Sequence, residues 1–186
     1  MAARVVVFGA SAPKPGDPAY QRAYHLGQAL ARAGYIVITG GYIGTMEAVS
    51  RGAAEAGGHV IGVTCEQIER WRPVGPNRWL HEEWRTRTLL ERLERMLTHG
   101  DAFLALPGGV GTLTEILLTW NHLLIRALPP RPLILIGQEL ADACQRTQEA
   151  LAAYFPPAAR HALLIASDPE DAVRILRAHV PPQEEP

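Results

Sequence analysis

The chain has 186 residues, of which 47% are hydrophobic and 20% charged, and its formal net charge is −1 at pH 7. This composition predicts a soluble globular domain with a sizeable core, and the near-zero charge argues against nucleic acid or a membrane surface as a partner. No apolar run reaches the roughly 18–20 residues of a membrane span. The first predicted strand lacks a signal-peptide pattern, so we expect a cytoplasmic protein.

Short apolar runs alternate along the chain with amphipathic segments. The apolar runs predict strands at residues 5–8, 35–39, 59–64, 102–106, 132–136 and 163–166. The amphipathic segments predict helices at residues 18–33, 45–56, 86–97, 112–125, 139–154 and 169–179. This alternation predicts an α/β fold with a doubly wound parallel sheet and helices on both faces. We expect a single domain over residues 1–180 and a disordered tail over residues 181–186.

Residues 65–84 interrupt the alternation with tryptophans, prolines and charged residues. We predict a long loop beside the ends of the strands. Two interpretations stay open, because loops of this length are often functional but can also be surface excursions packed by their own tryptophans.

The most informative segment is residues 107–115, P-G-G-V-G-T-L-T-E, which directly follows the predicted strand at 102–106. It predicts a glycine loop that opens a helix. A helix start has unpaired N–H groups and the positive end of the helix dipole, so it favours an anion. Gly108, Gly109 and Gly111 would let the backbone approach that anion closely, with Glu115 one turn further on. The alternative is structural: Thr112 and Glu115 also match a helix capping box.

The preceding helix carries a leucine- and methionine-rich stripe at helical spacing, made of Leu89, Leu90, Leu93, Met96 and Leu97. Its arginines, Arg92 among them, would lie on the other side, interleaved with glutamates. Residues 91–95 alone therefore favour a solvated face with ion pairs over a functional role for Arg92.

Several chemistries fit the sequence poorly. Lys14 is the only lysine and lies in a proline-rich loop, which argues against a pyridoxal-phosphate enzyme. Thr112 follows the last glycine of the loop where a Walker-type loop needs lysine. The third glycine of a nicotinamide-binding fingerprint is missing. Cys65 and Cys144 have no metal-ligand spacing, so we expect two buried or incidental thiols and no metal site.

Taken together, these motifs resemble those of the LOG-type phosphoribohydrolases, a family often labelled "lysine decarboxylase". Residues 107–115 match the family's P-G-G-x-G-T-x-x-E in full. Looser matches cover residues 91–96 (family E-R-K-x-x-M), residues 40–46 (family G-G-x-x-G-L-M) and residues 8–11 at the first turn. The chain departs from the family at Leu90, Leu93 and Thr45.

The resemblance implies a Rossmann-like, nucleotide-binding fold and a homodimer or higher homo-oligomer with sites near the subunit interface. It implies hydrolysis of the N-glycosidic bond of a nucleoside 5′-monophosphate, a cytokinin riboside monophosphate or a related purine or pyrimidine nucleotide, without a cofactor or metal. Carried over by position, Glu115 and Arg92 are the catalytic pair. The expected substrate-binding residues are Gly108, Gly109, Gly111, Thr112, Gly41, Gly44 and Ser11. The alternative function is a non-catalytic carrier of a phosphorylated ligand such as molybdenum cofactor.

Overall fold

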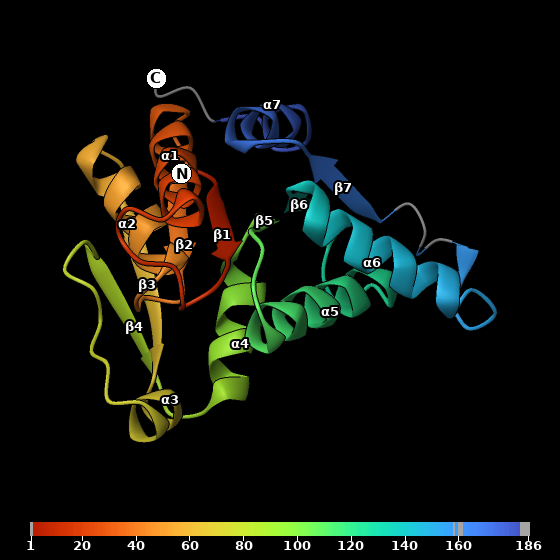
Figure 1. Cartoon of the computed structure of the whole chain (residues 1–186), viewed down its shortest axis with the longest axis horizontal. Coiled ribbons are helices and arrows are strands. Elements are labelled where there is room, and N and C mark those ends of the chain that lie inside the picture. Colours follow the sequence, from red (N-terminus) through yellow and green to blue (C-terminus); the bar gives the residue numbers. More distant parts are fainter. Residues whose placement is uncertain (1, 158, 160–161, 183–186) are drawn as a thin grey trace.

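The computed structural model describes residues 2–157, 159 and 162–182. Within them, a single parallel sheet has the strand order β4-β3-β2-β1-β5-β6-β7 (Figure 1). The strands are β1 (Arg4–Phe8), β2 (Ile36–Thr39), β3 (Val60–Cys65), β4 (Glu82–Thr86), β5 (Ala102–Ala105), β6 (Leu133–Ile136) and β7 (Leu163–Ala166). The helices are α1 (Pro18–Arg32), α2 (Thr45–Glu55), α3 (Glu66–Trp71), α4 (Leu89–His99), α5 (Val110–Leu124), α6 (Gln138–Ala150) and α7 (Pro169–His179).

Two hydrophobic cores lie on opposite faces of this sheet. Helices α1, α2 and α7 cover one face, and α4, α5 and α6 cover the other (Figure 1). Strand β1 contributes to both, because Val5 and Val7 point into the first core while Val6 and Phe8 point into the second. Continuous apolar strands are what a sheet covered on both faces requires. The predicted doubly wound α/β fold is therefore confirmed.

The path of the chain places a crevice at the middle of the sheet. The chain begins at the central strand β1, adds β2, β3 and β4 on one side, and then crosses to β5, β6 and β7 on the other. Strands β1 and β5 are adjacent and in register, with Phe8 opposite Ala105. Connections leaving them diverge, and ligands of such sheets bind in the crevice outside these carboxyl ends. Both glycine loops follow strands at this edge of the sheet.

The prediction of one long loop over residues 65–84 is wrong at its two ends and holds for residues 72–81, which form neither helix nor strand. This segment forms helix α3 and enters strand β4, which pairs in parallel with β3. The strand was missed because it has no apolar run. Glu82, Glu83 and Arg85 are all exposed on it, which suits an outermost strand with one edge facing solvent.

The predicted tail begins in the described part of the chain, where residues 181–182 follow α7 without regular structure, and from residue 183 on it lies outside the described residues. No helix of the described part is both long and apolar enough to cross a membrane.

Helices α1 and α2 approach each other unusually closely, and glycines make this possible. A Cβ atom on Gly27 of α1 would overlap the backbone carbonyl oxygen of Val49 on α2. Reciprocally, a Cβ atom on Gly52 of α2 would overlap the carbonyl oxygen of Tyr24 on α1. Because these obstacles are backbone atoms, rotation of a side chain cannot relieve the overlap.

We predict that Gly27→Ala lowers the free energy of unfolding by about 1–3 kcal/mol, as overpacking does, although alanine has the higher helix propensity. Urea unfolding followed by circular dichroism measures this. Gly75→Ala is the matched control, because a Cβ atom there meets nothing within 4 Å, and it should change stability by less than about 0.5 kcal/mol. Equal stabilities of the two variants would contradict the proposed close approach of α1 and α2.

Candidate active site

A cleft of about 370 Å³ lies at the carboxyl ends of the central strands. Its walls come from the loop after β1, the first glycine loop, α3, α4 and the start of α5. Among the residues predicted from the sequence, those that line it are Ser11, Arg92, Gly109, Gly111, Thr112 and Glu115. The topology thus brings together segments that are up to about a hundred residues apart in the sequence.

A buried ion pair forms the floor of the site. Arg92 Nη1 donates to Glu115 Oε1 at 3.2 Å, and the two side chains are only 6% and 10% exposed. Arg92 comes from α4 and Glu115 from α5, so the pair joins two helices. The prediction of a solvated arginine face is therefore wrong at Arg92. Leu90, which we placed in the core stripe, is 76% exposed instead, while Leu93 next to Arg92 is buried.

The guanidinium of Arg92 has a fixed position. Its Nε donates to the carbonyl oxygen of Val63 on β3 at 2.8 Å. A Cβ atom on residue 40 would overlap Nη2 of Arg92, so Gly40 gives the guanidinium its room. A planar guanidinium that bonds β3 through Nε and Glu115 through Nη1 has little rotational freedom. Glu115 therefore has one defined orientation relative to the cleft.

Burial changes the acidity of Glu115. Removal from solvent raises the pKa of its carboxyl above the ordinary value of 4.5, and the charge and hydrogen bond of Arg92 oppose this rise. We expected the helix N-terminus to favour the carboxylate. In the structure burial is the larger effect, which brings the group closer to the range in which a carboxyl exchanges protons during catalysis.

Helix α5 begins inside the glycine loop, two residues earlier than predicted. It starts at Val110 with Gly109 as its N-cap, and no side chain of the described residues caps it. The capping-box alternative is wrong here, because Thr112 already lies in the first turn and Glu115 bonds Arg92. A capping box does form on α4, between Thr88 and Glu91. The first residues of α5 line the cleft, and an uncapped helix start has free N–H groups that favour an anion.

The glycines of this loop divide into two kinds. A Cβ atom on Gly108 would overlap the hydroxyl oxygen of Thr112, so Gly108 makes room for the first turn of α5. At Gly109 and Gly111 a Cβ atom would meet nothing within 4 Å. These two line the open cleft, where the absence of a side chain leaves the backbone N–H groups approachable.

Like Gly108, the predicted binding residues Gly41 and Gly44 do not line the cleft. Both have positive φ angles, 79° and 77°, which favour glycine. A Cβ atom on Gly44 would overlap the carbonyl oxygen of Ala10. The next residue, Thr45, bonds that same oxygen through its backbone N at 2.8 Å and its hydroxyl at 3.0 Å. This loop therefore holds the wall of the cleft formed by residues 10–12.

Among the lining residues that escaped the sequence analysis, three have aromatic or charged side chains. Tyr42 lies in the first glycine loop, and its hydroxyl accepts from Cys65 N at 2.6 Å and donates to Cys65 O at 3.1 Å. Burial, the largest cause, raises the pKa of Tyr42 to about 12. Trp71, 80% exposed, and Arg72 come from the segment over residues 65–84. The tryptophans and arginines of this segment were the available signal, but the sequence pattern did not identify which of them line the cleft.

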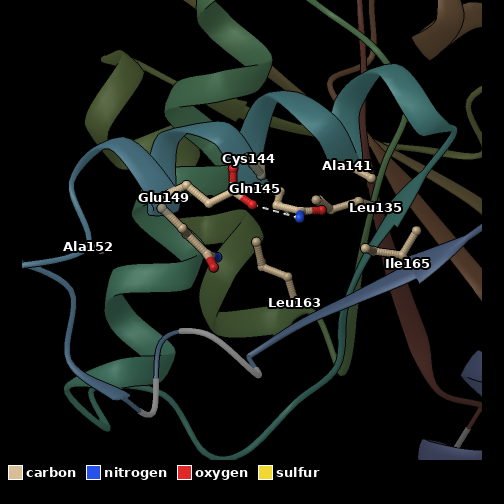
Figure 2. A pocket seen from close by; sticks show the side chains of 9 residues that line it. Leu135, Ala141, Cys144, Gln145, Glu149, Ala152, Leu163 and Ile165 are labelled. Carbon is tan, nitrogen blue, oxygen red and sulfur yellow. Dashed lines mark hydrogen bonds between the residues drawn. The ribbon is translucent and has the colours of Figure 1, made fainter.

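A second cavity, of about 360 Å³, lies between α6 and the outer strands β6 and β7 (Figure 2). Its lining is largely apolar, and two of its polar side chains bond each other, with Gln145 Nε2 donating to Glu149 Oε1 at 2.8 Å. Cys144 lines it, but burial raises the pKa of this thiol, which keeps it protonated and unreactive. The cavity contains no counterpart of the Arg92–Glu115 pair or the open helix start. The central cleft is therefore the better candidate.

Both cysteines are buried and free, as expected. Within the described residues, no three side chains of His, Cys, Asp or Glu gather closely enough to hold a metal ion.

A family model and two sequence relatives point to the same family. A family model described as "Possible lysine decarboxylase" matches residues 46–176. The chain is 31% identical to the cytokinin riboside 5′-monophosphate phosphoribohydrolase of Rhodococcoides fascians, covering 94% of this chain and 89% of that protein. It is 33% identical to such a phosphoribohydrolase of Arabidopsis thaliana, covering 80% and 70%.

Similar solved structures carry a different functional name. The molybdenum cofactor binding protein of Rippkaea orientalis superimposes with a TM-score of 0.73 at 25% identity, covering 96% of this chain and 97% of that one. The molybdenum cofactor carrier protein of Chlamydomonas reinhardtii gives a TM-score of 0.70 at 24% identity, covering 96% and 98%. The second likeness, at this identity, concerns the fold alone.

The buried pair predicts a coupled effect on stability. Arg92→Met should lower the free energy of unfolding by about 3–5 kcal/mol, because it leaves the Glu115 carboxylate buried without its partner. Arg92→Met combined with Glu115→Met should recover most of this loss. Chemical denaturation of both variants and the wild type measures the difference, and a double variant as unstable as the single one would contradict the coupling.

The loss in free energy of unfolding caused by Arg92→Met, its stability deficit, should also depend on pH. With the arginine gone, burial acts unopposed and the folded pKa of Glu115 lies further above its unfolded value. The folded state then binds the proton more tightly, so the stability of the variant falls as pH rises between these two pKa values. Denaturation of Arg92→Met and wild type from pH 4.5 upward should show the deficit shrinking toward the acid end. A deficit that is constant across pH would show that it does not come from the carboxylate.

Proposed function

Because the chain belongs to the family of the LOG-type phosphoribohydrolases, we propose that it hydrolyses the N-glycosidic bond of a nucleoside 5′-monophosphate. The products are a free base and ribose 5-phosphate. The observation that carries this proposal is the buried Arg92–Glu115 pair beside the uncapped start of α5, both in one cleft. The substrate is a cytokinin riboside monophosphate or a related purine or pyrimidine nucleotide.

The proposed chemistry assigns a task to each part of the cleft. The N–H groups at Gly109, Gly111 and Thr112 bind the 5′-phosphate. As the bond from C1′ to the base nitrogen breaks, its electron pair leaves with the base and the ribose gains oxocarbenium character. The Glu115 carboxylate stabilises this positive charge and accepts a proton from the water that attacks C1′, while the departing base takes up a proton from solvent. Arg92 keeps Glu115 oriented through its hydrogen bond.

A screen of base release tests the reaction directly. We expect the purified protein to release base from one or more nucleoside 5′-monophosphates, and much more slowly from the corresponding nucleosides, because nucleosides lack the anion that the start of α5 binds. Chromatography of the free base is the measurement. A folded protein in its native oligomeric state that releases no base from a broad panel of monophosphates would refute the proposal.

Removal of the carboxylate should abolish turnover but not binding. Glu115→Gln should lower kcat by about 10²–10⁴-fold, the range of a general acid–base group, while the dissociation constant for ribose 5-phosphate stays within a few-fold of wild type. Lys14→Ala is the control, because this exposed lysine lies outside the cleft, and it should retain full activity. Near-wild-type turnover by Glu115→Gln would rule out this mechanism.

The activity should depend on the protonation of Glu115. Because burial raises the pKa of Glu115, kcat/KM should fall as pH decreases through a value above 4.5, where the carboxylate takes up a proton and can no longer accept one from water. A profile of kcat/KM against pH measures this. An acid limb at or below 4.5 would contradict the role of the buried group.

We also propose that the protein acts as a homodimer or higher homo-oligomer. Besides the family resemblance, this is supported by apolar side chains left exposed near the site, namely Leu90, Val110, Leu113 and Leu117. Light scattering during size-exclusion chromatography measures the assembly, and a single-chain mass at micromolar concentration would refute it.

The alternative, a non-catalytic carrier of molybdenum cofactor, is the function named for structurally similar proteins at 24–25% identity. The phosphoribohydrolases are more similar in sequence, at 31–33%. A pterin that co-purifies with the protein and is lost on Gly109→Asp, together with a failure to release base, would favour the carrier.

A further inference from the structure

Arg72 lines the same cleft as the start of α5, at the point where the chain leaves α3. Its Nη1 donates to the hydroxyl oxygen of Ser11 at 3.0 Å, which places the guanidinium beside the loop after β1. We propose that Arg72 is a second phosphate-binding group, which grips the 5′-phosphate together with the N–H groups of α5. This inference rests on the proposed function for the identity of the anion, a sugar phosphate.

The charge balance of the cleft supports this role. Two guanidinium groups, of Arg72 and Arg92, and one carboxylate, of Glu115, line it. The charge of Arg92 is neutralised by its ion pair with Glu115. Arg72 takes part in none of the ion pairs within 4.0 Å that form among the described residues. The cleft therefore has an excess positive charge located on Arg72.

The hydrogen bonding of Arg72 gives a second, independent argument. Its Nε is buried and has no hydrogen-bond partner among the described residues. A buried donor without an acceptor is costly, so an acceptor from outside the chain, such as a ligand or a water molecule, is expected at this position. A guanidinium offers its donors as a planar fork that matches two phosphate oxygens. Arg72 thus holds one unused donor, and its positive charge meets the ring of Trp71, with the guanidinium carbon 5.7 Å from the ring centroid, rather than a carboxylate of the described residues.

A purely structural interpretation gives different expectations. If Arg72 served only to hold Ser11 and the loop after β1, its loss would disturb nucleosides and nucleotides alike. If it binds phosphate, its loss weakens only ligands that carry one. The ratio between a phosphorylated ligand and its unphosphorylated counterpart therefore separates the two roles.

The neighbouring Arg70 offers a matched control. It lies two residues away on α3, its side chain is 77% exposed, and it pairs with Glu66 one turn earlier. It does not line the cleft. Replacing Arg70 or Arg72 by glutamine removes the same charge from nearly the same place in the sequence, so long-range effects of charge should be similar in the two variants.

Calorimetric titration with ribose 5-phosphate is the first test. Arg72→Gln should raise its dissociation constant by about 10- to 100-fold, the effect of losing charge-assisted hydrogen bonds. Arg72→Lys should recover part of this loss, and Arg70→Gln should bind like wild type. In turnover assays, Arg72→Gln should raise KM for the nucleoside monophosphate and leave kcat/KM for the nucleoside unchanged. Wild-type affinity in Arg72→Gln, or equal losses for nucleotide and nucleoside, would overturn the inference.

Chemical modification of the wild-type protein tests the inference even if Arg72→Gln does not fold. Phenylglyoxal modifies arginines, and mass spectrometry of peptides locates the product. Ribose 5-phosphate should protect Arg72 from modification, ribose should not, and Arg70 should react equally in all samples. Equal labelling of Arg72 with and without ribose 5-phosphate would overturn the inference.

The outcomes also separate this inference from the proposed reaction. Ribose 5-phosphate binding that requires Arg72 in a protein that releases no base would support the phosphate role and refute the hydrolase. Base release together with ribose 5-phosphate binding that is independent of Arg72 would support the hydrolase and refute the phosphate role of Arg72.

Discussion

The ion pair between Arg92 and Glu115 is the constraint on which the rest of the site depends. It joins α4 to α5, and through Val63 it also joins both helices to β3. Burial of two charges is unfavourable unless each has a partner with good geometry, so the surroundings must be fitted to them. Gly40 leaves space for the guanidinium, and α4 and α5 pack against the same face of the sheet, which lets the pair form.

Most of the fold could be predicted from the sequence. A parallel sheet covered on both faces needs continuous apolar strands, and these are recognisable as uninterrupted runs of apolar residues. Strand β4 was the exception. Its side chains are mostly charged, and its backbone is extended because β3 supplies a pairing edge. That pairing depends on a neighbour about twenty residues away, and so no local pattern contains it.

The residues of the candidate site could be predicted where a short sequence segment has the required composition. They could not be predicted where their role depends on contacts with residues far away in the sequence. The glycine loop at 107–115 indicated an anion site by its own composition. Arg92, by contrast, has the same local surroundings as a surface arginine, and helical spacing alone assigned it to the solvent. Only its proximity to Glu115, from a helix 23 residues further along, explains its burial. Arg72 was missed for the same reason, since its partner Ser11 is 61 residues away.

The charged strand β4 has a consequence for the behaviour of the whole molecule. Strand β3 is buried along all six of its residues, and without β4 its hydrogen-bonding edge would be free to pair with a strand of another molecule. The charged glutamates and arginine along β4 disfavour pairing of another molecule's strand with this outer edge of the sheet. The charged residues that prevented the prediction of β4 as a strand therefore also protect the protein against edge-to-edge aggregation.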